Sequence, residues 1–88
     1  MYDVRIANAP RKFIKRAQEK LKGRICSLFK ILSDNPIPHN EFDLKKLEGS
    51  KNAYRIRISS FRVRYEVYWK EKIVRITDIE KRSETTYK

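Results

Sequence analysis

Four arginines alternate with apolar or aromatic residues in two neighbouring segments of the chain. Residues Tyr54–Ile58 read Tyr-Arg-Ile-Arg-Ile, and residues Phe61–Tyr65 read Phe-Arg-Val-Arg-Tyr. A period of two is typical of a strand with one buried face. If the apolar residues face a core, the open face carries Arg55, Arg57, Arg62 and Arg64. Because the fixed fork of guanidinium donors suits phosphate oxygens, this face is a candidate phosphate-binding surface.

A solvated sheet face that does no chemistry would show the same alternation. Such faces usually mix charges of both signs, whereas Glu66 is the sole acid that we expect on this one. Tyr68 should lie on the same face, where its ring could stack on a base. The excess of one sign favours phosphate binding over an inert surface.

The charge of the whole chain also favours an anionic partner. Its 88 residues include 22 Lys and Arg against 11 Asp and Glu, which gives a formal net charge of +11. Like charges repel in a compact domain, so a surface this basic is expected to meet nucleic acid, a membrane surface or an acidic protein. The basic residues are spread along the chain, which favours a folded basic face over a disordered arm.

Other kinds of site find little support in the sequence. No cluster of Asp, Glu and His has metal-ligand spacing, and Gly23 and Gly49 alone make no phosphate-binding loop. His39 is the only histidine, so a ribonuclease site with two histidines cannot be built. Cys26 is the only cysteine, and we expect it to fill the helical core. The sequence therefore predicts neither a metal nor a small-molecule cofactor.

Three features favour a cytoplasmic protein without a membrane partner. A small domain that can form no internal disulfide suggests a reducing compartment. The apolar runs are a few residues long, too short for a spanning helix. Asp3 and Arg5 interrupt the first apolar stretch, which is unlike a signal peptide.

The elements that must position the arginines follow from the apolar periodicity. Alternation over residues 2–6 predicts a short N-terminal strand. Apolar residues then recur at intervals of three and four, which predicts either one long helix or a helical hairpin with a turn near Glu19–Gly23. This apolar stripe consists of Phe13, Ile14, Ala17, Leu21, Ile25, Leu28, Phe29 and Leu32. The length of the chain predicts one domain over residues 1–88.

The second half of the chain is expected to form three strands. The first is Tyr54–Ile58, the second is Phe61–Trp69, and the third is Ile73–Ile79 after a turn at residues 70–72. A strand, helices and then a three-stranded meander indicate an α+β fold. In such a fold the helices pack on one face of a mainly antiparallel sheet.

Four segments of this half of the chain form an ordered pattern: Phe42–Gly49 with its closing Leu-x-Gly, Tyr54–Ile58, Phe61–Tyr65, and Lys81-Arg82 followed by Tyr87. In this order they resemble the RelE toxins of the RelE/ParE superfamily, particularly the short archaeal-type members. The resemblance implies a toxin of a type II toxin–antitoxin system that cuts mRNA in the ribosomal A site. Cleavage in this family proceeds by attack of a ribose 2′-hydroxyl on the adjacent phosphate, without metal.

The resemblance also implies a role for particular residues. Arg62 would contact the scissile phosphate, Arg82 would stabilise charge or help the leaving 5′ oxygen, and Tyr87 would act as general base or orient the attacking hydroxyl. The residues expected to hold RNA are Arg55, Arg57, Arg64 and Lys81. Arginine stands at positions 55 and 57, which are often lysine in the family, and it does not easily release a proton. The implied partners are a cognate RelB-like antitoxin, the ribosome and mRNA.

Two other functions compete with the ribonuclease. A ParE-like protein would inhibit DNA gyrase and cut no RNA, but such proteins usually lack the full set of Arg62, Arg82 and Tyr87. A non-catalytic nucleic-acid-binding module would use the same basic sheet. An activity assay separates that module from an enzyme.

Overall fold

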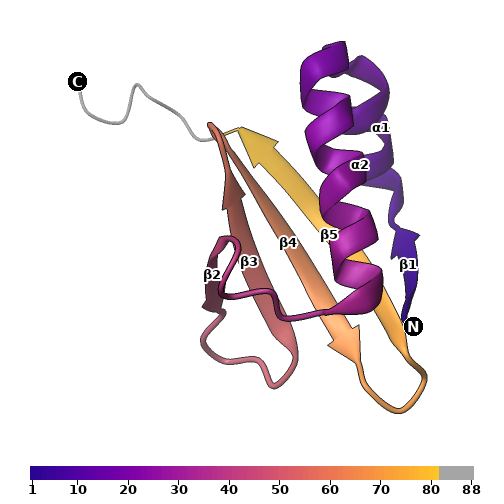
Figure 1. Cartoon of the computed structure of the whole chain (residues 1–88), viewed down its shortest axis with the longest axis vertical. Coiled ribbons are helices and arrows are strands. Elements are labelled where there is room, and N and C mark those ends of the chain that lie inside the picture. The colour runs from indigo at the N-terminus through magenta and orange to yellow at the C-terminus, as the bar shows by residue number, and fades with distance from the viewer. Residues whose placement is uncertain (82–88) are drawn as a thin grey trace.

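A computed structural model describes residues 1–81 of the chain as one sheet covered by two helices. The elements in chain order are β1 (Asp3–Ile6), α1 (Asn8–Arg16), α2 (Glu19–Asp34), β2 (Asp43–Lys46), β3 (Ala53–Ile58), β4 (Phe61–Tyr68) and β5 (Ile73–Lys81). The five strands lie in the order β1-β5-β4-β3-β2. Figure 1 shows both helices on the same side of the sheet, as the sequence predicted for this α+β fold.

The meander of β3, β4 and β5 is antiparallel, in agreement with the sequence. The N-terminal strand β1 pairs in parallel with β5, so the first and last strands of the chain lie side by side. The sequence missed β2, which pairs antiparallel with β3 at the far edge of the sheet. Its residues read Asp-Leu-Lys-Lys, and one apolar residue makes no alternation.

The helical half is a hairpin, but its turn precedes the expected position. Ala17 and Gln18 have extended backbone conformations and separate the two helices. Gly23 lies inside α2, exposed and with open space around it. A glycine in a helix costs about 1 kcal/mol relative to alanine, which the packing of the same helix can offset. Within residues 1–81, neither helix is long and apolar enough to cross a membrane.

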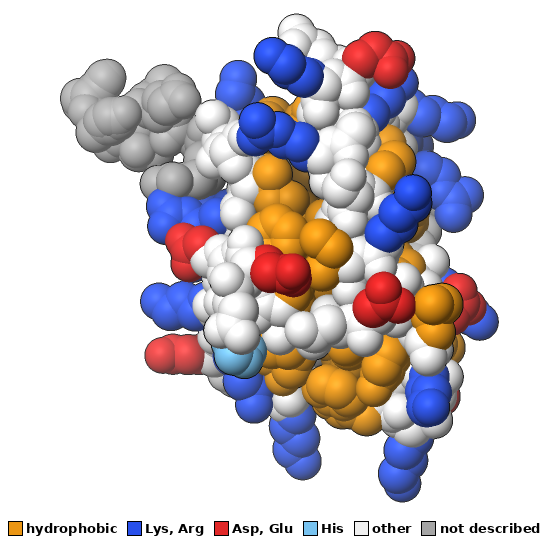
Figure 2. All heavy atoms as spheres, in the orientation of Figure 1, with side chains coloured by type: hydrophobic (Ala, Val, Ile, Leu, Met, Phe, Trp, Pro, Cys, Tyr) orange, Lys and Arg blue, Asp and Glu red, His pale blue; other side chains and the backbone are white. Residues whose placement is uncertain are grey.

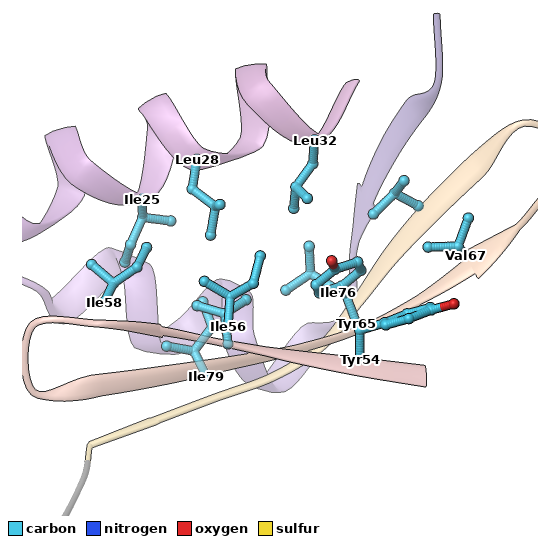
Figure 3. Packing of buried hydrophobic residues seen from close by; sticks show 12 residues of the cluster. Ile25, Leu28, Leu32, Tyr54, Ile56, Ile58, Tyr65, Val67, Ile76 and Ile79 are labelled. Atoms are coloured by element: carbon cyan, nitrogen blue, oxygen red, sulfur yellow. The ribbon is translucent and has the colours of Figure 1, made fainter. Parts of the chain in front are cut away.

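The core lies between α2 and the inner face of the sheet. Figure 3 shows Ile25, Leu28 and Leu32 of α2 pointing toward the strands. The strands contribute every second residue, namely Tyr54, Ile56 and Ile58 from β3, Val63, Tyr65 and Val67 from β4, and Val74, Ile76 and Ile79 from β5. The period of two predicted for β3 and β4 is therefore confirmed, and it leaves the arginines on the outer face.

Cys26, which the sequence predicted to be buried, is exposed, and so is Trp69 at the end of the predicted second strand. Cys26 faces solvent, because it follows the buried Ile25 by one residue and one residue turns the helix by about 100°. Trp69 follows the end of β4 and is 48% exposed. Its ring packs edge-on against Tyr2, with 5.9 Å between centroids. The core therefore ends at Val67 on this strand.

Tyr65 joins the sheet to the loop that follows α2. Its side chain is fully buried, and its hydroxyl donates a hydrogen bond of 2.8 Å to the carbonyl oxygen of Pro36. Its ring stacks on Tyr54, with 5.8 Å between centroids. Burial, and secondarily the nearby Tyr54, raise the pKa of the Tyr65 phenol above its ordinary value.

The raised pKa of Tyr65 predicts a loss of stability at alkaline pH. Above about pH 10 the unfolded chain releases the phenol proton while the folded chain keeps it, so the free energy of unfolding falls with rising pH. Tyr65→Phe leaves the Pro36 carbonyl without its donor and should cost about 1–3 kcal/mol at neutral pH. Urea unfolding of both proteins should show this difference shrinking above about pH 10. A difference that stays constant with pH would contradict the assignment.

Candidate nucleic-acid interface

The four arginines of β3 and β4 face each other across the two strands. Arg55 lies opposite Arg64, and Arg57 lies opposite Arg62. Each alternates with a buried neighbour, so all four stand on the face of the sheet that the helices leave uncovered. Opposite residues in antiparallel strands have Cβ atoms about 5 Å apart, so the four side chains converge as the sequence predicted.

Residues of β2 and β5 extend these pairs into two rows across the sheet. We call the two rows the arginine face. The first row is Asp43, Arg57, Arg62 and Glu80, and the second is Lys45, Arg55, Arg64 and Asp78. The sequence placed Glu66 as the sole acid on the open face of the sheet, and that prediction was wrong, because β2 and β5 bring three further carboxylates to it.

These carboxylates hold two of the four arginines in ion pairs. Arg57 Nη1 lies 3.1 Å from Asp43 Oδ2. Arg64 Nη2 lies 2.9 Å from Glu80 Oε2, and its Nη1 lies 4.0 Å from Asp78 Oδ2. The side chains in these pairs are roughly one third to three fifths exposed, so each pair contributes only about 0–1 kcal/mol to stability. An incoming anion can therefore compete for these guanidiniums.

Arg55 and Arg62 make no ion pair within residues 1–81. Their Nε atoms are buried and have no hydrogen-bond acceptor among the described residues, and the same holds for Arg64. A buried donor without an acceptor costs about 1–3 kcal/mol, so these arginines are held on the face at some cost to stability. The two guanidiniums free of carboxylates are the natural first contacts for such an anion.

Tyr68 lies on the outer face of β4, further along the strand from the arginines. Its hydroxyl donates a hydrogen bond to the Glu66 carboxylate. This hydrogen bond is the main reason that the pKa of Tyr68 is raised. The ring is suited to stacking on a base, and the hydroxyl proton is engaged with Glu66.

The structure separates one expected RNA-binding residue from the arginines. Lys81 lies opposite Phe61, whose ring packs against Phe13 of α1 on the helix side of the sheet. Lys81 lines a cleft of about 780 Å³ there, together with Lys12 and Arg16. The expected catalytic residues Arg82 and Tyr87 lie outside the described residues.

Other candidates stay apart from the arginine face. His39 is exposed in the loop between α2 and β2. In the part of the chain that the structure describes, no group of His, Cys, Asp and Glu could hold a metal ion. The helix side, seen in Figure 2, shows basic side chains around a strip of apolar ones and differs in character from the arginine face. The residues beside α2 that line a groove there include Leu28, Phe42 and Ile58.

A helical hairpin on one face of a five-stranded sheet is the fold of the solved RelE toxins. The crystal structure of the archaeal RelE–RelB complex from Pyrococcus horikoshii OT3 contains a chain that matches 94% of this chain and 97% of its own length. The TM-score is 0.85 at 31% sequence identity. The intact E. coli RelBE toxin–antitoxin complex matches 94% of this chain and 99% of its own, with a TM-score of 0.79. The sequence identity to that chain is 16%, so this match shows that the two chains share a fold and nothing about function.

The family is shown by the sequence comparisons. A family model described as the ParE toxin of the type II toxin–antitoxin system parDE matches residues 5–86. A protein of Methanocaldococcus jannaschii assigned as toxin RelE1 is 48% identical over 61 residues, which are 69% of this chain and 67% of that protein. The chain therefore belongs to the RelE/ParE toxin family of type II toxin–antitoxin systems, as its sequence motifs suggested.

Proposed function

We propose that this toxin is a ribosome-dependent endoribonuclease that cuts mRNA without a metal cofactor and so inhibits translation. The observation that carries the proposal is the arginine face, where Arg55 and Arg62 are free of ion pairs within residues 1–81. A basic sheet of this kind, on the fold of the RelE toxins, is suited to a single-stranded RNA backbone. The net charge of +11 would add long-range attraction to it.

The proposed reaction is an internal transfer of a phosphate ester. The ribose 2′ oxygen forms a bond to the adjacent phosphorus while the bond from phosphorus to the 5′ oxygen breaks. The 2′-hydroxyl gives up its proton and the departing 5′ oxygen gains one, which leaves a 2′,3′-cyclic phosphate and a 5′-hydroxyl. Negative charge grows on the phosphate oxygens in between, and a fixed guanidinium at Arg62 would stabilise it.

The remaining roles rest on the family resemblance. Tyr87 would accept or orient the 2′-hydroxyl proton, and Arg82 would stabilise charge at the leaving oxygen. Arg55, Arg57 and Arg64 would hold the RNA backbone around the scissile phosphate, with Lys81 as a more distant contact. The ribosome would supply the orientation of the mRNA that so small and open a face cannot impose by itself.

We also propose a RelB-like antitoxin as the partner in the resting complex. The matched Pyrococcus horikoshii and E. coli structures are complexes of a RelE with a RelB. An acidic antitoxin would suit a toxin of net charge +11, because charge complementarity speeds and specifies association.

Cleavage of programmed ribosomes tests the proposal directly. We expect mRNA to be cut in the ribosomal A site, to yield 2′,3′-cyclic phosphate and 5′-hydroxyl ends, and to be cut poorly when free of the ribosome. End-group analysis of the products checks the chemistry. A parallel supercoiling assay with DNA gyrase tests the ParE-like alternative. Inhibition of gyrase without RNA cleavage would overturn the proposed function in favour of a ParE-like gyrase inhibitor. RNA binding without either activity would identify the chain as a non-catalytic nucleic-acid-binding module.

A further inference from the structure

The first row of the arginine face ends in an acid on each side, and no part of the proposed reaction uses these two acids. In the first row, Asp43 and Glu80 flank Arg57 and Arg62 on either side. Glu80 lies opposite Arg62 but reaches diagonally to Arg64, whose Nη2 is 2.9 Å from its Oε2. Asp43 lies opposite Arg57 and holds its Nη1 at 3.1 Å. Each row-end acid of the first row thus occupies one arginine.

A carboxylate and a phosphate present the same kind of acceptor to a guanidinium. An arginine that holds a carboxylate must release it, or share its donors, before it can hold a phosphate. Asp43 therefore competes with RNA for Arg57. Glu80 is the nearer of the two carboxylates that compete for Arg64, since Asp78 lies 4.0 Å from its Nη1. The two arginines left open, Arg55 and Arg62, are diagonal neighbours on β3 and β4. Diagonal positions are about 7–8 Å apart, so two long side chains there can reach one phosphate.

We propose that Asp43 and Glu80 act as internal anions that restrict the arginine face to one open phosphate site, formed by Arg55 and Arg62. This inference rests on the proposed function, since it concerns how the same face takes RNA. The acids lower the affinity for arbitrary RNA, because every further phosphate contact must displace a carboxylate. Specificity often depends on such repulsive elements. Free RNA is bound weakly, and the ribosome-oriented mRNA is selected.

Binding of a short 2′-O-methyl RNA oligonucleotide tests the proposal. This probe has no free 2′-hydroxyl, so binding is measured apart from cleavage. Glu80→Gln removes one charge and keeps the side-chain shape. A unit charge at 4 Å in water is worth about 1 kcal/mol, so the affinity should rise about fivefold at low salt. The slope of log affinity against log salt should steepen by about 0.7 for one additional phosphate contact on a single strand.

Asp3→Asn provides the matched control. Asp3 also pairs with an arginine, Arg5, at 3.0 Å, and its replacement changes the net charge by the same amount. It lies opposite Ile73 at the other end of β5, about 20 Å from Glu80 at the usual rise of a strand. That separation exceeds the Debye length of about 10 Å at 0.1 M salt, so its effect should be small.

A double-mutant cycle identifies the arginine through which Glu80 acts. In an Arg64→Gln background, Glu80→Gln should no longer raise the affinity or steepen the salt slope. Asp43→Asn should behave like Glu80→Gln, and its effect should vanish in an Arg57→Gln background. It also serves as the second variant if Glu80→Gln does not fold, which a thermal melt detects.

Three results overturn the inference. Glu80→Gln and Asp43→Asn that bind no better than Asp3→Asn would show that the acids do not restrict the face. Gains that persist without Arg64 and Arg57 would show a general charge effect. In either case, cleavage of programmed ribosomes by the unaltered protein would leave the proposed function standing. Failure of the unaltered protein to bind the oligonucleotide at low salt would remove the RNA-binding face and the inference together.

Discussion

Arg62→Ala is expected to lower the rate of mRNA cleavage on programmed ribosomes by about 10²–10³, the usual cost of losing one preorganised donor to a developing negative charge. Arg62 makes no ion pair within residues 1–81, and its Nε is buried without an acceptor among them. No carboxylate of the described residues therefore competes with the scissile phosphate for its guanidinium. Ribosome binding should change much less, because many basic residues contribute to it. Single-turnover cleavage at saturating toxin separates the two quantities.

Arg75→Ala is the control for Arg62→Ala, since it removes the same charge from the same sheet. Arg75 is exposed on β5, where its Nη1 lies 3.9 Å from Glu66 Oε1, outside the two rows of the arginine face. Its replacement should leave single-turnover cleavage close to that of the unaltered protein. If both variants lose activity equally, the reaction depends on overall charge, and Arg62 does not specifically stabilise the charge that develops on the scissile phosphate.

The arginine pairs could be predicted because β3 and β4 keep a strict period of two across a short turn. In β3 and β4, every buried residue is apolar or aromatic, and each of the four arginines falls between two such positions or next to one. A two-residue turn at Ser59-Ser60 then fixes the register that sets Arg57 opposite Arg62. Local sequence determined this part of the site.

The carboxylates of the arginine face could not be predicted in the same way. Asp43 reaches the face through β2, whose four residues carry too little periodicity to define a strand. The position of Asp78 and Glu80 on this face depends on an irregularity in β5. Arg64 of β4 pairs with Asp78 whereas its neighbour Tyr65 pairs with Ile76, so β5 has one extra residue there. A signal for it exists, because the buried residues Ile76 and Ile79 are three apart instead of two. An extra residue of this kind marks a β-bulge.

The bulge matters for the chemistry because it decides which face of the sheet the end of β5 presents. The Thr77 hydroxyl donates a hydrogen bond of 3.2 Å to the carbonyl oxygen of Arg64, where the strands lose their regular pairing. Without the extra residue, Asp78 and Glu80 would point to the core side, since a shift by one residue reverses every side chain. The electrostatics of the arginine face therefore follow from strand pairing, which a reading of separate segments does not contain.

Tyr87→Phe is expected to have the largest effect of any single substitution, a slowing of cleavage by about 10²–10⁴, the usual contribution of a general base. The family resemblance assigns this residue to the attacking 2′-hydroxyl. Phenylalanine keeps the ring and removes the oxygen, so stacking on RNA survives while proton transfer does not. Single-turnover rates should fall without a matching loss of ribosome binding. Tyr68→Phe is the control, because it removes the same atom from a tyrosine on the outer face of β4 whose hydroxyl already donates a hydrogen bond to Glu66. It should cleave at nearly the unaltered rate. If Tyr87→Phe also cleaves at that rate, the proton acceptor is another group; if Tyr68→Phe is the slow variant, the base lies on β4.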